Sequence, residues 1–140
     1  MELAVKRLHP EAHLPEFAHP TDAGMDLFSI EDKLIPAGQR VLIATGIALA
    51  IPADHVGLIW DKSGLATKSG ITTLAGVIDS GYRGELLIAI LNTSDQSYNI
   101  AMGQKVAQLL VQPISHPIIT AVDALPEADR GERGFGSTGL

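Results

Sequence analysis

The sequence contains no cysteine among its 140 residues. This absence excludes a disulfide-stabilised scaffold, a thiolate zinc site and a cysteine nucleophile. No uninterrupted apolar run approaches the roughly 18 residues that a membrane-spanning helix needs. The segment up to Arg7 also lacks the apolar stretch and cleavage site of a secretory signal. We therefore expect a cytoplasmic protein without membrane attachment.

Aromatic residues and positive charges are also scarce. Only 4% of the residues are aromatic although 46% are hydrophobic, so the core must consist of Val, Ile, Leu and Ala side chains. Asp and Glu outnumber Lys and Arg by 16 to 10, which gives a net charge of −6. This balance argues against binding long nucleic acid through a basic face. A small anionic ligand remains compatible with it, because such a ligand needs only a local group of donors.

Glycine and proline, in contrast, are frequent, at 14 and 8 residues. The short apolar runs that lie between these turn signals are typical of an all-β sandwich or barrel. Helical periodicity is nearly absent, and only residues 63–68 are expected to form a helical turn, with Ser63 as its cap. The length predicts a single domain. The predicted β-type runs cover residues 3–8, 40–44, 46–51, 55–60, 86–91, 105–111 and 118–122.

The first candidate site is the segment Asp61-Lys62-Ser63-Gly64, which follows a predicted strand. An ammonium group, a hydroxyl and the backbone N–H groups at the start of a helical turn together suit a phosphate. The segment is not a P-loop, because the glycine spacing of that motif is missing. An ordinary strand-to-turn connection explains the same residues.

The second candidate site is the segment from Gly76 to Glu85. Asp79 comes directly after the apolar Val77 and Ile78, and a carboxylate against an apolar wall can act as a general base toward water. Tyr82 offers a flat face to a sugar or a base. A β-hairpin turn is the alternative explanation for Asp79 and Ser80.

The third candidate site is the glycine-rich tail from Arg130 to Gly139. It combines an arginine for phosphate, two hydroxyl residues and Phe135, which can stack on a flat ring once the tail closes over a ligand. A disordered C-terminus explains the same composition. The five histidines, at positions 9, 13, 19, 55 and 116, show no recognised metal-ligand spacing.

Taken in order, these segments resemble the homotrimeric dUTP pyrophosphatases (dUTPases). The resemblance implies a jelly-roll-like all-β subunit, with a β domain over residues 1–129 and a C-terminal arm over 130–140 that closes an active site. It also implies hydrolysis of dUTP to dUMP and pyrophosphate with Mg²⁺, at sites shared between the subunits of a homotrimer. The five motifs that carry it are Ala23–Ser29, Lys62–Ala66, Gly76–Glu85, Gly103–Leu109 and Arg130–Gly139.

The same resemblance implies a role for individual residues. Asp79 would activate the attacking water, Gln108 would help to hold that water, and Asp26 would lie near the water shell of Mg²⁺, which the substrate phosphates mainly hold. Tyr82 would pack under the deoxyribose and Phe135 would stack on uracil. The implied phosphate contacts are Lys62, Ser63, Gly64, Arg130, Ser137 and Thr138, and Gly136 is a further implied substrate contact. The implied base contacts are backbone groups at Thr73, Val77, Ile78 and Leu87.

Four departures from the family pattern stand out. Asp61-Lys62 replaces the usual Pro-Arg, Lys105 replaces an arginine, Gly81 replaces an acidic residue and Arg133 replaces a glycine. The lysine replacements leave open a non-catalytic regulator that keeps the fold and binds nucleotide or protein partners. Gly81 leaves open dCTP deaminase, which shares the fold, although the catalytic glutamate of that enzyme would fall on Ala89.

Overall fold

The computed structural model describes residues 1–129, 131 and 132. Within this part of the chain there are ten strands and one short helix, and all of the strand pairs between them are antiparallel. The elements are β1 (Ala4–Arg7), β2 (Met25–Phe28), β3 (Lys33–Ile35), β4 (Arg40–Ala50), β5 (His55–Asp61), α1 (Ser63–Ser69), β6 (Ile71–Leu74), β7 (Val77–Ile78), β8 (Glu85–Asn92), β9 (Tyr98–Ile100) and β10 (Lys105–Pro113).

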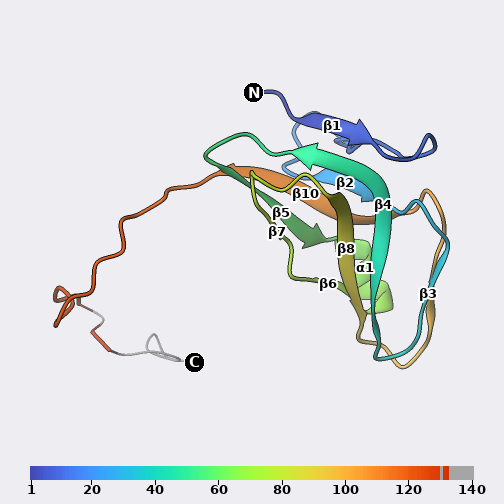
Figure 1. Ribbon diagram of the computed structural model, residues 1–140. Coiled ribbons are helices and arrows are strands. Elements are labelled where there is room, and N and C mark those ends of the chain that lie inside the picture. The colour runs from blue at the N-terminus through green and yellow to red at the C-terminus, as the bar shows by residue number, and fades with distance from the viewer. Residues whose placement is uncertain (130, 133–140) are drawn as a thin grey trace.

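Two four-stranded sheets form the body of the molecule (Figure 1). One sheet has the order β1-β4-β8-β6 and the other has the order β2-β10-β5-β7, while β3 and β9 form a separate two-stranded ribbon. The predicted all-β architecture is therefore confirmed. Because β6 and β7 follow each other in the chain but belong to different sheets, the segment between them connects the two layers.

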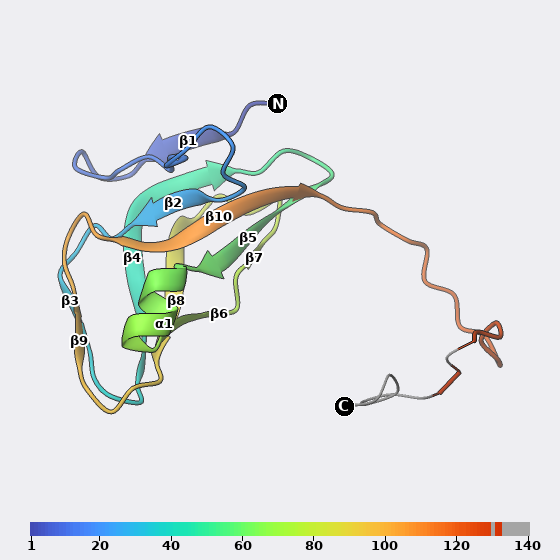
Figure 2. The ribbon, with the colours of Figure 1, turned by 180° about the vertical axis from the view of Figure 1, so that it is seen from behind.

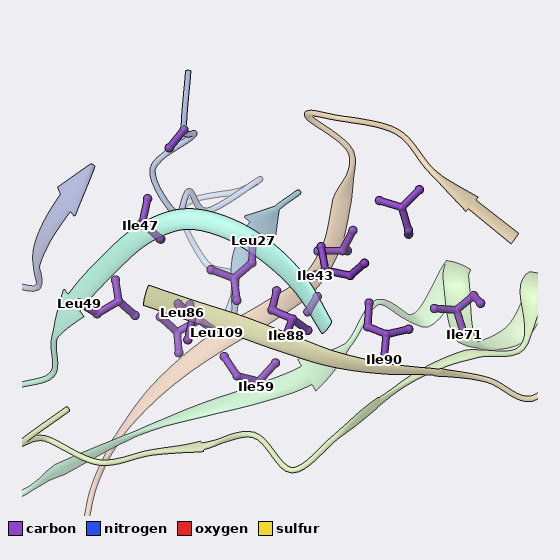
Figure 3. Packing of buried hydrophobic residues seen from close by; sticks show 14 of the residues in the cluster. Leu27, Ile43, Ile47, Leu49, Ile59, Ile71, Leu86, Ile88, Ile90 and Leu109 are labelled. Atoms are coloured by element: carbon purple, nitrogen blue, oxygen red, sulfur yellow. The ribbon is translucent and has the colours of Figure 1, made fainter. Parts of the chain in front are cut away.

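The core lies between the sheets and is aliphatic, as the composition predicted (Figure 3). Along β8, Leu86, Ile88 and Ile90 are buried while Leu87 is exposed, which is the two-residue alternation of a strand with one face in the core. From the opposite sheet, Leu109 of β10 and Ile59 of β5 pack into the same cluster. The core thus holds β5 and β10 in place, and both strands lead into the site.

Strand β4 is longer than the sequence indicated. The runs 40–44 and 46–51 were expected as separate segments, but they form one strand that continues through Gly46. Its pairing with β8 shifts register between Ala44 and Ala48, and Gly46 has a φ of 68°. A β-bulge at a glycine bends a strand without ending it, so the glycine here marks a bend.

The strands end at Pro113, and the described residues that follow extend away from the body (Figures 1 and 2). The prediction of a β-type run at 118–122 is wrong, since Ile118 and Ile119 are 94% exposed and have no strand partner within the described residues. Apolar β-branched residues favour strands only where another strand can pair with them. None of the helices in the described part of the chain has the length and hydrophobicity needed to cross a membrane.

Candidate functional site

A cavity of about 610 Å³ opens at the end of the β2-β10-β5-β7 sheet, next to α1. Figure 2 shows β2, β10 and β5 side by side there, with α1 directly after β5. Four of the predicted site residues, Asp26, Lys62, Ser63 and Gln108, line this cavity. They come from three separate motifs of the sequence. The other lining residues are Ala18, Asp22, Ala23, Gly24, Trp60, Asp61 and Leu110.

Asp26 is the electrostatic centre of this cavity. Its side chain is almost fully buried, with the residue 3% exposed, and each of its carboxylate oxygens faces a lysine. Lys62 Nζ lies 2.5 Å from Oδ1 and Lys105 Nζ lies 2.7 Å from Oδ2. Burial alone would raise the pKa of Asp26, but the bonds from Lys105 and Lys62 outweigh it and leave the pKa lowered. The ionised carboxylate and two ammonium groups sum to one positive charge, which Glu16 offsets because its Oε1 lies 3.6 Å from Lys105 Nζ.

The same carboxylate is the candidate metal contact. The described residues contain no group of three or more His, Cys, Asp or Glu side chains that could enclose a cation. Mg²⁺ commonly keeps several of its waters and binds through substrate phosphates with one or two carboxylates. Asp26 lines the cavity, but both of its oxygens are paired with lysines, so its contact with the water shell of Mg²⁺ stays a prediction.

Lys62, Ser63 and Gly64 form the turn from β5 into α1. Lys62 has extended backbone angles and precedes the first helical residue, so Ser63 begins the helix and the prediction that Ser63 caps it is wrong. The Lys62 ammonium donates to Asp26, and because it has no acceptor it cannot cap the backbone N–H groups of the helix. A Cβ at Gly64 would have no neighbour within 4 Å, so the backbone there is open to a ligand.

Gln108 of β10 is held by a backbone group and by a close packing contact. Its Nε2 donates to the Asp61 carbonyl oxygen at 2.8 Å, which fixes the plane of the amide. A Cβ added to Gly24 would overlap Gln108 Oε1, so the glycine makes room for this orientation. Because Nε2 is committed to Asp61, Oε1 is the atom of Gln108 that can accept a hydrogen bond from a water in the cavity.

A second cavity, of about 320 Å³, lies between β5 and the segment 72–77. Thr73 and Val77, two of the predicted base contacts, line it together with Asp61, Thr72 and others. Gly76 closes one side, where its φ of 106° and the approach of Ile59 O within 2.8 Å of an added Cβ exclude a larger residue. Trp60 is 58% exposed and lines both cavities, so the two cavities are neighbours.

Asp79 and Tyr82 lie elsewhere in the chain, on the loop that leads from β7 to β8. Both are exposed, and neither lines either of the two cavities. Tyr82 N donates to Asp79 O at 3.0 Å and Tyr82 Oη donates to Glu85 O at 2.9 Å, so a tight turn holds them together. Leu87, on the outer face of β8, is also outside the cavities. A single copy of the chain therefore does not place Asp79 beside Gln108.

The tail residues expected to close the site lie outside the described residues. These are Arg130, Phe135, Gly136, Ser137 and Thr138, and the departure at Arg133 lies there too.

Comparison with known proteins assigns this arrangement to a family. The dUTPase family model matches residues 10–139. The chain belongs to the dUTPase family. A deoxyuridine 5'-triphosphate nucleotidohydrolase of Clostridium kluyveri is 48% identical to it, over 99% of both chains. The corresponding protein of Rhodococcus erythropolis is 44% identical, over 99% of this chain and 87% of the relative.

Solved dUTPase structures have the same fold. The dUTPase of Staphylococcus bacteriophage 80alpha with dUpNHpp superposes with a TM-score of 0.93 at 34% identity, over 99% of both chains. A D95N mutant dUTPase from phage phi11 of S. aureus, solved to show the coordination of a structural Mg(II) ion, gives a TM-score of 0.85 at 31% identity, over 91% of this chain and all of that chain. The predicted jelly-roll-like dUTPase fold is thereby confirmed.

Three residues of this dUTPase site escaped the sequence analysis. Trp60 looked like the end of an apolar strand, yet its ring lines both cavities. Asp61 was named within the first candidate segment and as a departure but was given no role, although its carboxylate accepts hydrogen bonds from Thr73 of β6. Gly24 was named only as part of the motif Ala23–Ser29. Its contact with Gln108 could not be predicted, because the two residues are far apart in the sequence. Of these three residues, only Asp61 carried a signal in the sequence, because it replaces the proline that is usual in the family.

Proposed function

We propose that this chain hydrolyses dUTP to dUMP and pyrophosphate. The observation that carries the proposal is the first cavity, where a trio of one carboxylate and two ammonium groups lies beside Gln108 in a chain with the dUTPase fold. Phosphoryl transfer needs charge neutralisation, an aligned water and a closed site more than it needs covalent participation by the protein. The enzyme would act in the cytoplasm. Its product dUMP would serve thymidylate synthesis, and removal of dUTP would keep uracil out of DNA.

The triphosphate would lie along the turn into α1. Lys62 supplies charge, Ser63 a hydroxyl and Gly64 an open backbone, and Lys62 and Ser63 line the cavity together with Asp26. Mg²⁺ bound to the phosphates would neutralise further charge, and Asp26 would contact its water shell. Lys62 can leave Asp26 for a phosphate oxygen because Lys105 continues to neutralise the buried carboxylate.

Two residues would act on the attacking water, one by positioning it and the other by accepting its proton. Gln108 holds it through Oε1, and Asp79 takes its proton as general base. Since Asp79 lies outside the cavities of its own chain, we infer that it reaches the cavity of a neighbouring copy. The assembly would be the homotrimer of the family, in which Tyr82 packs under the deoxyribose and the arm from 130 to 140 brings Phe135 and its polar residues over the nucleotide.

The surface of the chain supports such an assembly. Leu42 and Leu87 are exposed on the outer face of the β1-β4-β8-β6 sheet, on strands that pair with each other. The described segment after Pro113 leaves the body (Figure 1) and exposes five large apolar side chains, namely Ile114, Ile118, Ile119, Val122 and Leu125. Apolar surface of this extent is typical of a region that another protein chain covers.

The decisive experiment measures pyrophosphate release from dUTP beside dCTP, dTTP and UTP, with Mg²⁺ and with a chelator. We expect pyrophosphate release from dUTP but not from the other three nucleotides, and we expect the chelator to abolish it. Ammonia release from dCTP would instead support the deaminase, and tight dUTP binding without turnover would support the regulator. Mass measurement of the native protein tests the trimer.

Substitution of Asp79 tests the assigned general base. Asp79→Asn keeps the shape of the side chain and removes its basicity, so we expect kcat to fall by at least a hundredfold. Turnover within about threefold of the parent would show that another group accepts the proton. Asp54→Asn is the matched control, because Asp54 is an exposed residue of another turn.

A further inference from the structure

The end of strand β5 is held from both sides, but by different kinds of contact. On one side, β10 pairs with β5 as far as Asp61, the last residue of the strand. On the other side, β7 pairs with Gly57 and Leu58, and one further backbone bond joins Ile59 N to Gly76 O at 2.8 Å. Beyond Ile59, β5 therefore has no strand partner on that side within the part of the chain that the structure describes.

The carboxylate of Asp61 takes the place of the missing strand partner. Oδ2 accepts from Thr72 Oγ1 at 2.7 Å, and Oδ1 accepts from Thr73 Oγ1 at 2.7 Å and from Thr73 N at 2.6 Å. Both threonines belong to β6 in the other sheet, where they pair with Leu91 and Ile90 of β8. The carboxylate thus ties the last residue of β5 to a strand that is itself anchored.

The carboxylate is ionised when it accepts these bonds. Burial would raise the pKa of Asp61, but the bonds from Thr73 and Thr72 outweigh it and lower the pKa. Hydrogen bonds to an ionised acceptor are shorter and stronger than those between neutral groups. The family usually has proline at this position, and the ring of proline restrains the backbone by fixing φ. Asp61 supplies through hydrogen bonds a restraint that proline supplies through its ring.

This restraint fixes the position of the backbone carbonyl oxygen of Asp61. Gln108 Nε2 donates to that oxygen at 2.8 Å, and this is the only hydrogen bond of the Gln108 side chain among the described residues. A carbonyl oxygen accepts and cannot donate, so it must face the NH₂ end of the amide. The contact therefore decides which end of the Gln108 amide is left for the first cavity, and that end is Oε1.

The direction of the amide matters for an attacking water. A water held by two acceptors gives a hydrogen to each of them and keeps its lone pairs for the phosphorus atom. With Oε1 toward the cavity, Gln108 is one such acceptor, and Asp79, the proposed general base, is the other. A reversed amide would instead donate a hydrogen to the water and occupy a lone pair that the attack needs.

We propose that Asp61 is a positioning residue for the attacking water: its carboxylate holds the end of β5 so that its own carbonyl oxygen keeps Gln108 Oε1 toward the cavity. This inference rests on the proposed function, since it takes the water held by Gln108 as the nucleophile. Asp61 acts on that water only through Gln108, which is the residue that contacts it.

The test combines kinetics with dUTP and the NMR signal of the Gln108 side-chain amide. Asp61→Ala removes the carboxylate and keeps the backbone carbonyl, whereas Asp61→Asn keeps one oxygen that can accept from Thr73. Thr45→Val is the matched control, because it removes a buried hydrogen bond of 2.6 Å to Leu86 O at a residue that lines neither cavity. Asp61→Ala is also made together with Gln108→Ala.

We expect Asp61→Ala to lower kcat about tenfold or more and to leave KM within about twofold, because a catalytic group displaced by roughly 1 Å loses much of its effect. In the Gln108→Ala background the same substitution should change kcat less than about twofold, since the two residues act as one unit. Asp61→Asn should keep kcat within about threefold of the parent, and Thr45→Val within about twofold. The Gln108 amide signal should shift in Asp61→Ala and stay in place in Thr45→Val.

A folded Asp61→Ala variant with parental kcat would overturn the proposal, and so would a loss that persists in full in the Gln108→Ala background. If Asp61→Ala does not fold, Thr72→Val combined with Thr73→Val replaces it, because this pair removes two of the three bonds and leaves Asp61 intact. Parental kcat in that double variant overturns the proposal, and a fall of about threefold or more supports it. A parent that does not turn over dUTP would contradict the proposed activity, and the Gln108 amide signal would then decide by itself whether Asp61 holds the amide.

Discussion

At the scale of single residues, the orientation of the Gln108 side chain depends on two close contacts. Gln108 is held on one side by the Asp61 carbonyl and on the other by the bare backbone of Gly24. Gly24 does not have the positive φ that would by itself require glycine, so the reason for glycine at this position is the space taken by Gln108.

Replacement of Gly24 by alanine should therefore reduce catalysis more than stability. The added methyl group would displace the Gln108 amide, and a displacement of about 1 Å in a catalytic group can reduce the rate roughly a hundredfold. We expect kcat for Gly24→Ala to fall between ten- and a hundredfold, with a near-parental melting temperature. Gly81→Ala is the control, since an added Cβ there meets nothing within 4 Å. Unchanged kcat in Gly24→Ala would show that Gln108 is free to relocate.

Asp61 also predicts how stability responds to acid. Its folded-state pKa lies below the unfolded value of 3.8, because the threonine bonds outweigh the effect of burial. A lowered carboxylate pKa stabilises the folded state above the unfolded pKa, and this contribution is lost as the pH falls through the folded pKa. Asp61→Asn does not titrate, so the parent should exceed it in melting temperature at pH 7 and lose that advantage below about pH 4. A constant difference from pH 7 to pH 3 would contradict this account.

At the scale of secondary-structure elements, buried polar side chains connect pieces that the sheets leave separate. Asn92, at the end of β8, is fully buried and donates to Ile35 O of β3 at 3.1 Å and to Gln96 O at 2.7 Å. Its Oδ1 accepts from the backbone N and the hydroxyl of Ser94. A single amide thus anchors the β3-β9 ribbon and the turn after β8 to the main body.

Loss of this amide should destabilise the fold strongly. Asn92→Leu has a similar volume but removes the partner of the buried Ile35 carbonyl and of the part-buried Ser94 N–H, and we expect the free energy of unfolding to fall by roughly 3 kcal/mol. Urea denaturation measures this difference. Asn99→Leu, at an exposed position of β9, serves as the control and should change stability by less than about 0.5 kcal/mol. An equal effect of the two substitutions would refute the anchoring role of Asn92.

The sequence predicted elements well where a strand has one buried face and poorly where chemistry interrupts that pattern. The apolar run from Leu86 to Leu91, which ends at the turn signal after it, made β8 evident, and the structure shows that its residues alternate between buried and less buried positions. Strand β2 was missed because Asp26 lies in the middle of it, and only the lysines of β10 and the phosphate turn explain a buried carboxylate there. Motif order led to the residues of the first cavity, whereas the bond between Asp61 and Thr73 depends on how two sheets meet.

At the scale of the whole molecule, one copy of the chain keeps the predicted general base apart from the first cavity. The cavity with Gln108 and the loop with Asp79 belong to the same chain but lie apart, and the segment after Pro113 leaves the body without a partner strand among the described residues. Assembly of several copies would satisfy both observations, because it would supply a neighbour for the loop and a surface for the exposed isoleucines.

Charges on the exposed isoleucines should weaken that assembly. Ile118→Asp combined with Ile119→Asp would bury carboxylates at the contact, so we expect lower-mass species at micromolar protein concentration and a parallel loss of dUTP turnover. Sedimentation over a range of concentrations measures the change. Thr120→Asp introduces a charge into the same segment at a polar position and should leave the mass unchanged. Parental mass in the double variant would show that the segment lies outside the contact.

The trio around Asp26 has a consequence for how this chain can change during evolution. Lys62 and Lys105 neutralise the same buried carboxylate from opposite sides, and each stands where the family usually has arginine. A substitution at either position changes how much of the negative charge of Asp26 the other residue must neutralise. The effects of the two positions on the site are therefore coupled. The effect of returning arginine to one of them therefore depends on what occupies the other.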